Sequence, residues 1–86
     1  MKVFFHRSFE KAYKKLPERI QTQFKKRLAL FCQNPFDPIL NNHNLEGKFK
    51  ECRSINVSGD IRALYVPLEG ETAAFLLIGT HSDLYS

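Results

Sequence analysis

Three β-prone runs in the second half of the chain most constrain its fold. Between Lys48 and Ile78 the sequence changes to short stretches rich in β-formers, with the runs FKECRSINV, IRALYVPL and TAAFLLI. The segments SGD and EGE separate these runs, and each contains the glycine that a tight turn favours. The pattern therefore predicts a three-stranded antiparallel meander with one face covered by other elements.

The first half of the chain is predicted to form two amphipathic helices, which cover one face of the meander. Apolar residues recur at helical spacing in HRSFEKAYKKL, where we expect Ser8 to cap the helix and assign no role to His6. A second stripe runs through PERIQTQFKKRLALFCQN, which NPFDP ends. The initial run KVFF is a short strand that joins the sheet. We thus predict an α+β fold, β-α-α-β-β-β, in which a helical hairpin packs on an antiparallel sheet in one domain, residues 1–86.

Composition narrows the partners and the compartment. The formal net charge is +4 and the sequence pI is near 9.3, which favours an anionic partner such as RNA, DNA or an acidic protein segment. The two cysteines match no metal-site spacing and are typical of reduced thiols. No apolar run approaches the ~18 residues that span a bilayer, and MKVFF is too short for a signal peptide. We therefore expect a cytoplasmic protein that does not enter membranes.

The turn between the first two meander strands decides which polar side chains share a face. A two-residue loop would place Arg62 on the same face as Ile55. A three-residue loop, 58–60, pairs Asn56 with Arg62 and separates the polar and apolar faces better, so we favour it. In a meander the end of the third strand lies near the start of the second. His81 is therefore expected beside Asp60 and Arg62.

Histidines, arginines and an aspartate on one basic surface suit the cleavage of RNA. RNA carries its own nucleophile, the 2′-hydroxyl, so the protein needs only a base, an acid and cations that stabilise the phosphorane. Histidine serves either proton role because its unperturbed pKa lies near 6.5. Arginine presents a planar fork that matches phosphate oxygens. This chemistry requires no metal.

Other interpretations of the same residues stay open. His43, His81 and Asp60 would be the candidates for a metal site, but no two of them have the short local spacing of a zinc site. A nucleophilic triad that includes Ser82 and His81 is disfavoured, because adjacent side chains on an extended segment diverge. Purely structural roles are a solvated His43, a snorkelling Arg53, a turn-capping Asp60 and a hydrophobic lid at Tyr85.

The order HNLEGKFKECRSINV, GDIRALYV and IGTHSDLY resembles the RelE/ParE superfamily of bacterial toxins, and within it the YafQ-like branch of mRNA interferases. The resemblance runs over essentially the whole chain and is most specific in the ending GTHSDLY. It implies a microbial-RNase-like fold and a type II toxin that cuts mRNA in the ribosomal A site as a metal-independent endoribonuclease without a cofactor. It also implies an antitoxin that masks the basic face, with operator DNA contacted only through the antitoxin complex.

The resemblance also implies roles for particular residues, with the assignment of acid and base left open. The catalytic residues would be His43, Asp60 and His81, and the substrate-binding residues would be Arg53, Asn56, Arg62 and Tyr85. Asn56 departs from the branch, which commonly carries a histidine there, and an amide cannot exchange a proton near neutral pH. Two alternatives follow: a ParE-like inhibitor of DNA gyrase, and a catalytically weakened homologue that binds RNA or antitoxin.

Overall fold

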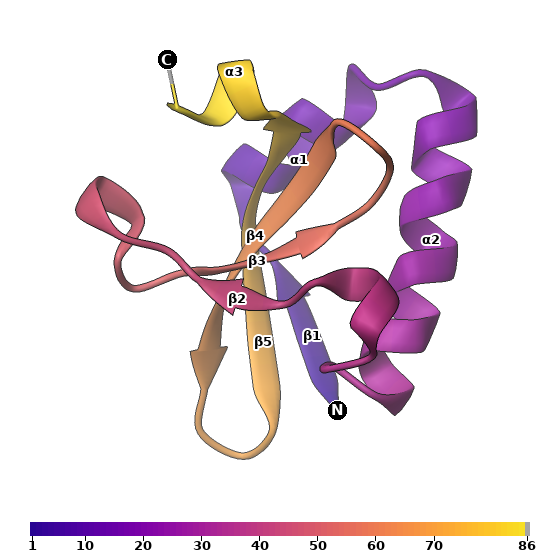
Figure 1. Cartoon of the computed structure of the whole chain (residues 1–86). Coiled ribbons are helices and arrows are strands. Elements are labelled where there is room, and N and C mark those ends of the chain that lie inside the picture. The colour runs from indigo at the N-terminus through magenta and orange to yellow at the C-terminus, as the bar shows by residue number, and fades with distance from the viewer. Residues whose placement is uncertain (86) are drawn as a thin grey trace.

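The computed structural model describes residues 1–85, in which helices and short turns surround one sheet (Figure 1). In chain order the elements are β1 (Lys2–Phe5), α1 (Arg7–Lys14), α2 (Glu18–Gln33), the 3₁₀ turn η1 (Pro38–Leu40), β2 (His43–Asn44), the 3₁₀ turn η2 (Gly47–Phe49), β3 (Arg53–Asn56), β4 (Ile61–Leu68), β5 (Thr72–Thr80) and α3 (His81–Tyr85). None of the helices within residues 1–85 is both long enough and apolar enough to cross a membrane.

The strands form a single sheet in the order β1-β5-β4-β3-β2. The predicted α+β class, helical hairpin and antiparallel meander β3-β4-β5 are confirmed. The prediction of a wholly antiparallel sheet is wrong, because β1 runs parallel to β5 and the sheet is mixed. No tight turn joins β1 to the meander, since both helices intervene, so the turn geometry that imposes antiparallel pairing is absent there. The short edge strand β2 is an addition to the predicted order.

The turn between β3 and β4 has the predicted three-residue loop. Asn56 pairs with Arg62, and the Val57 N–H donates a hydrogen bond of 2.9 Å to the carbonyl of Ile61. The alternation along both strands then sends Ile55 and Ala63 toward the helices, where both are fully buried. Asn56 and Arg62 therefore belong to the other face of the sheet.

A β-bulge in the β4–β5 pair supplies apolar side chains to both faces of the sheet. Leu64 pairs with Leu77, but the next residue, Tyr65, pairs with Phe75, so Leu76 is an extra residue on β5. The bulge changes the alternation of β5 at this point. Phe75 consequently points to the helices, whereas Leu76 and Leu77 pack on the opposite face with Leu64.

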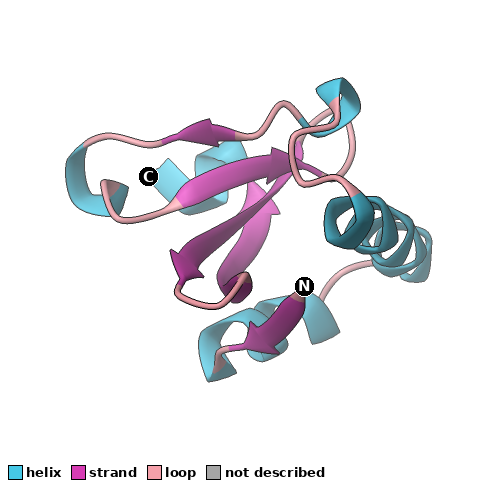
Figure 2. Ribbon diagram, turned by 90° about the horizontal axis from the view of Figure 1, so that it is seen from below, coloured by secondary structure: helices cyan, strands magenta, loops and turns pink. Residues whose placement is uncertain are grey.

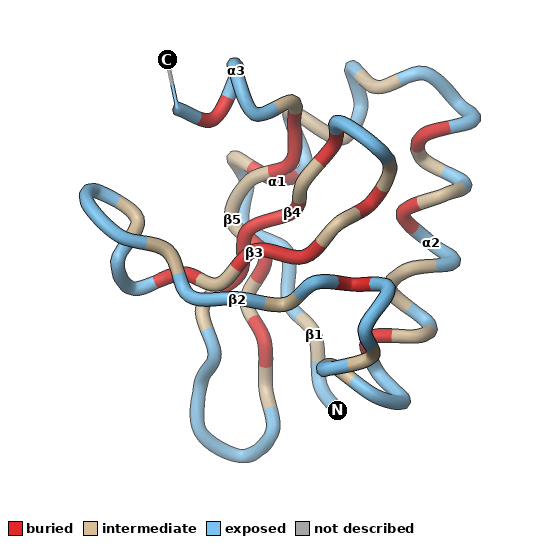
Figure 3. Tube along the Cα trace, in the orientation of Figure 1, coloured by how far each residue is buried: buried red, intermediate tan, exposed pale blue. Residues whose placement is uncertain are grey.

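Helices α1 and α2 cover one face of the sheet and form the main core with it. This helix-side core contains Phe9, Ile20, Phe24, Phe31 and Leu40 from the first half of the chain, and Ile55, Val57, Ile61, Ala63, Tyr65, Ala73, Phe75 and Ile78 from the sheet. Figure 3 shows these buried segments along the middle of the strands and on one side of α2. The predicted apolar stripe of α2 is thus confirmed.

The start of α1 differs from the prediction in its capping residue. His6, not Ser8, is the N-cap, and its Nδ1 accepts a hydrogen bond of 3.1 Å from the Ser8 N–H. The Ser8 hydroxyl instead donates a bond of 2.6 Å to the carbonyl of Leu76, the bulged residue. A bulge leaves backbone groups unpaired, so Ser8 satisfies one of them and attaches α1 to β5.

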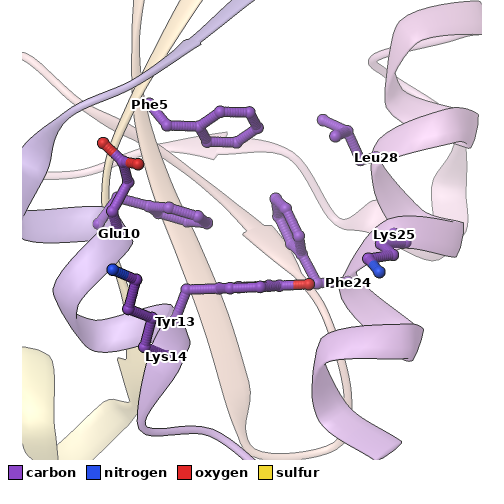
Figure 4. A pocket seen from close by; sticks show the side chains of 8 residues that line it. Phe5, Glu10, Tyr13, Lys14, Phe24, Lys25 and Leu28 are labelled. Carbon is purple, nitrogen blue, oxygen red and sulfur yellow. The ribbon is translucent and has the colours of Figure 1, made fainter. Parts of the chain in front are cut away.

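An aromatic pocket of about 330 Å³ lies between α1 and α2, and Figure 4 shows side chains of both helices facing it. Its lining residues are Phe5, Phe9, Glu10, Tyr13, Lys14, Phe24, Lys25 and Leu28. The lining is mostly apolar, and none of the seven predicted site residues belongs to it. The pocket is therefore separate from the residues that the sequence singles out.

A second, smaller core lies on the other face of the sheet. Its buried members are Cys52, Leu64 and Leu84, and Leu45, Phe49, Val66, Leu76 and Leu77 pack against them. The predicted strand from Phe49 is wrong in its first half, because η2 and a closed loop precede β3. Gly47 at φ +70° starts this loop, and the Cys52 N–H donates to the Phe49 carbonyl at 2.8 Å. Figure 2 shows this loop on the side of the sheet where α3 lies, away from α2.

Helix α3 is fastened to the end of β5 by a reciprocal cap. The Thr80 N–H donates to Asp83 Oδ2 at 3.1 Å, and the Asp83 N–H donates to Thr80 Oγ1 at 3.0 Å. The strand runs through Gly79 and ends at Thr80. Gly79 serves another purpose, since a Cβ there would lie 3.2 Å from the Asp83 Cβ. The glycine makes room for the cap.

This geometry predicts that Thr80→Ala and Asp83→Ala each destabilise α3 by about 1 kcal/mol, as for other lost N-caps. Amide hydrogen exchange should become faster at Leu84 and Tyr85. The double variant should lose less than the sum of the two, because both substitutions remove parts of one reciprocal interaction. Exposed Ser82 provides the control: if Ser82→Ala accelerates exchange as much as Thr80→Ala, the cap does not hold α3.

Candidate active site

The side of the sheet opposite α1 and α2 carries most of the predicted site residues, and we call it the open face. It is defined by the side chains of Ser54, Asn56, Arg62, Leu64 and Leu77, which alternate with helix-side residues or belong to the smaller core. Helix α3 and the loop that contains η2 lie beside this face (Figure 1). The open face thus combines a small apolar floor with polar groups.

Asn56 and Arg62 form a cross-strand pair on the open face. The Arg62 guanidinium turns back onto the hairpin, where Nη1 donates to the carbonyls of Ser58 at 2.9 Å and Ile61 at 3.1 Å. The Asn56 Oδ1 is buried and has no hydrogen-bond partner within residues 1–85. A buried acceptor without a partner is uncommon in proteins. This pair therefore contributes one cation to the open face, next to an amide whose oxygen is covered by protein and left unsatisfied.

His43 stands at the edge of the same face. It pairs with Ser54, whose own partner on β4 is Leu64, so the three residues form one row across β2, β3 and β4. The His43 Nδ1 lies 2.8 Å from the carbonyl oxygen of Asn41. Because a carbonyl oxygen only accepts, Nδ1 carries the proton and donates it. In the neutral ring Nε2 then keeps a lone pair, as a general base requires.

Arg53 does not join this group. It pairs with Tyr65, a member of the helix-side core, and thus faces the opposite side of the sheet. Its Nε donates to the Asn42 Oδ1 at 2.7 Å, and Nη1 donates to the Asn44 Oδ1. The guanidinium carbon lies 5.2 Å from the centre of the Phe36 ring. Arg53 therefore holds the segment on either side of His43 together.

The tail brings His81 to the end of the β4–β5 pair where Asp60 lies. Thr80 pairs with Ile61, so His81 and Asp60 each stand one residue beyond this last pair. Both side chains are exposed. The predicted proximity of His81 to the start of β4 is confirmed by this register. Asp60 and His81 can consequently approach the same ligand from neighbouring strand ends.

Tyr85 lies over the open face, against His81. The two ring centres are 4.6 Å apart and the planes are inclined by 42°. Leu84 anchors the tail to the smaller core, since only 6% of that residue is exposed. Burial raises the pKa of the Tyr85 hydroxyl, Cys52 acts in the same direction, and the charge of Arg62 lowers it in part. Tyr85 is therefore a neutral phenol at neutral pH, close to Arg62.

Phe49 is an open-face residue that the sequence analysis did not single out. Its ring meets Tyr85 edge to face, with 5.7 Å between centres and 81° between planes. The sequence placed Phe49 in a strand, where its neighbours in space could not be inferred. The only signal was its position two residues after Gly47, the glycine at which the chain turns.

The side chains of the described part of the chain do not gather into a metal centre. Within residues 1–85 no three histidine, cysteine, aspartate or glutamate side chains come close enough to hold a metal ion. Cys52 is buried in the smaller core, and burial, with the nearby charge of Glu51, raises the pKa of its thiol. A protonated, buried thiol is neither a ready metal ligand nor a nucleophile.

Comparisons with known proteins agree with this fold. Residues 1–86 match the YafQ toxin family, described as a bacterial toxin of type II toxin-antitoxin systems, whereas no curated protein matches the chain. YafQ from E. coli strain BL21(DE3) is 22% identical, with a TM-score of 0.82 and coverage of 99% of this chain and 98% of that chain. A chain of the E. coli DinJ-YafQ toxin-antitoxin complex is 22% identical, with a TM-score of 0.79 and coverage of 99% and 97%.

A more distant likeness is to the RelBE toxin-antitoxin complex from Mycobacterium tuberculosis, at 20% identity and a TM-score of 0.76, with 93% of this chain and 96% of that chain covered. At these identities the likeness to the solved structures shows that the fold is shared, and nothing more. The family match adds the biological role, because it extends over every residue of the chain. The chain belongs to the YafQ family of bacterial toxins of type II toxin-antitoxin systems.

Proposed function

We propose that this toxin is a metal-independent endoribonuclease that cleaves mRNA, with His43, Asp60 and His81 as its catalytic residues. The observation that carries the proposal is the make-up of the open face. Two histidines from separate segments border a surface that also presents Arg62 and Tyr85. Two proton-transfer groups and a cation are the parts that this reaction needs, and an aromatic ring can stack on a base of the RNA.

The reaction uses the 2′-hydroxyl of the RNA as nucleophile. Its oxygen attacks the adjacent phosphorus, its proton passes to a base, the bond from phosphorus to the 5′-oxygen breaks, and an acid protonates that oxygen. The products are a 2′,3′-cyclic phosphate and a 5′-hydroxyl. We assign the base to His43, because its Nδ1 is committed to Asn41 and leaves Nε2 free. His81 then serves as the acid, and Asp60 assists it.

The sheet connects the two assigned histidines through the smaller core. The row from His43 through Ser54 to Leu64 crosses three strands of the open face. Leu64 packs in the smaller core with Leu84 of α3, the helix that begins with His81. The open face therefore leads from His43 to the helix that carries His81.

The other open-face residues bind the substrate in this proposal. Arg62 leaves the hairpin carbonyls to stabilise the phosphorane, and the amide of Asn56 contacts the same nucleotide. Tyr85 stacks on a base, as aromatic side chains do in the recognition of single-stranded RNA. Arg53 contributes indirectly, because its hydrogen bonds to Asn42 and Asn44 flank His43.

The partners follow from the family and from the charge. We propose a cognate antitoxin that masks the basic surface, by analogy with the DinJ-YafQ and RelBE complexes, and contact with operator DNA only through that complex. The net charge of +4 suits the ribosomal A site as the place of cleavage in the cytoplasm.

His81→Ala and His43→Ala should each lower the rate of mRNA cleavage by ~10²–10⁴, because each removes one proton transfer. The measurement is cleavage of a defined mRNA on purified ribosomes, with transcript 5′ ends mapped after induction in cells. His6→Asn is the matched control. It also replaces a histidine, but asparagine can still cap α1, and α1 packs on the side of the sheet opposite the open face. An absence of cuts with wild-type toxin contradicts the proposal. DNA damage signalling with inhibited supercoiling would identify a gyrase inhibitor instead.

Asn56→His should raise the cleavage rate up to ~10²-fold, the lower range of a proton-transfer contribution. It introduces beside Arg62 the histidine that related toxins commonly carry. Asn56→Ala should lower substrate affinity without lowering stability, because it removes an acceptor that already lacks a partner. Single-turnover cleavage and urea unfolding measure the two effects. If neither variant changes the cleavage rate, Asn56 has no role in the site.

A further inference from the structure

We infer that Phe49 is a positioning residue that orients Tyr85 and, through it, the imidazole of His81. Its catalytic consequence rests on the proposed function, whereas the arrangement of the rings does not. Three aromatic rings from two distant segments form a continuous series over the open face. Phe49 meets Tyr85 edge to face at 5.7 Å, and Tyr85 lies against His81 at 4.6 Å.

The loop holds Phe49 firmly enough to serve as a support. The Leu45 N–H donates to the Cys52 carbonyl at 3.2 Å, and the Cys52 N–H donates to the Phe49 carbonyl at 2.8 Å, so the loop closes on itself. The Phe49 side chain is partly buried in the smaller core. The Lys48 ammonium lies 5.1 Å from the centre of the Phe49 ring, a favourable cation–π distance.

Helix α3 needs such a support because it is short. A helix of five residues has too few internal hydrogen bonds to be stable alone. The cap between Thr80 and Asp83 fixes its beginning, and Leu84 fixes one side. Tyr85 is 37% exposed, and Phe49 and His81 are its aromatic neighbours among the described residues. Phe49 is therefore the aromatic contact that holds Tyr85 from outside the helix.

The consequence for His81 follows from its spacing to Tyr85. Residues four apart lie on the same side of a helix, so a displaced Tyr85 frees the imidazole to rotate. The edge-to-face contact of Phe49 is specific in geometry, because an aromatic pair prefers this arrangement to others of equal buried area. An aliphatic side chain of similar size fills the space but does not set the plane of the Tyr85 ring.

The test compares Phe49→Tyr, Phe49→Leu and Phe49→Ala in the purified toxin by NMR, with the His81 Cε1–Hε1 resonance as the readout. The ring of Tyr85 imposes a ring-current shift on this resonance. We expect the shift to persist in Phe49→Tyr, and to move in Phe49→Leu and Phe49→Ala toward its value in Tyr85→Ala. Phe4→Ala, which removes a side chain that is 59% exposed on β1, is the matched control.

Cleavage kinetics supply the second readout. Phe49→Leu should lower kcat roughly tenfold to a hundredfold with little change in KM, as a misplaced catalytic group does, and Phe49→Tyr should restore it. An unmoved His81 resonance in Phe49→Leu, or an equal movement in Phe4→Ala, overturns the inference. A moved resonance in a toxin that cleaves no RNA upholds the positioning role and refutes the nuclease. Phe49→Leu keeps the test valid if Phe49→Ala does not fold.

Discussion

The bulge between β4 and β5 is the constraint on which the rest of the structure depends. Without the extra residue, Leu76, strict alternation would assign the apolar side chains of β5 differently to the two faces. With it, Phe75 completes the core under α1 and α2, while Leu76 and Leu77 remain for the open face. The same residue receives the Ser8 hydroxyl and so attaches α1 to the sheet. The bulge at Leu76 thus allows a short chain to build one core on each face of its sheet.

The smaller core matters for chemistry because it stabilises two short segments, α3 and the loop around η2, that carry residues of the proposed site. Helix α3 and the loop around η2 are each too short to be stable in isolation, yet each contributes a side chain to the floor made by Leu64 and Cys52. Their mutual contact, Phe49 on Tyr85, joins the middle of the chain to its end. The histidine that we assign as acid is thereby carried on a supported helix.

Much of this could be predicted from the sequence, and the failures have physical reasons. Period-two runs and glycine turns predict β3, β4 and β5 because these patterns are local, and the Asn56–Arg62 pair follows from the loop length. The parallel β1 depends on which sheet edge is free, which no local pattern encodes. Arg53 looks like a phosphate ligand in the sequence, but its register directs it to the helix side, where Asn42 and Phe36 occupy it.

By itself the sequence determined the fold class, the meander with its turns, the basic charge and the residue types His43, Asp60, Arg62 and His81 that suit phosphodiester chemistry. Tertiary structure alone decided which contacts complete the site. Pairing register separates Arg53 from the open face, the carbonyl of Asn41 selects the tautomer of His43, and Phe49 meets Tyr85. The reason is that propensity and periodicity act between neighbours in the chain, whereas a site is made by contacts between residues far apart in it.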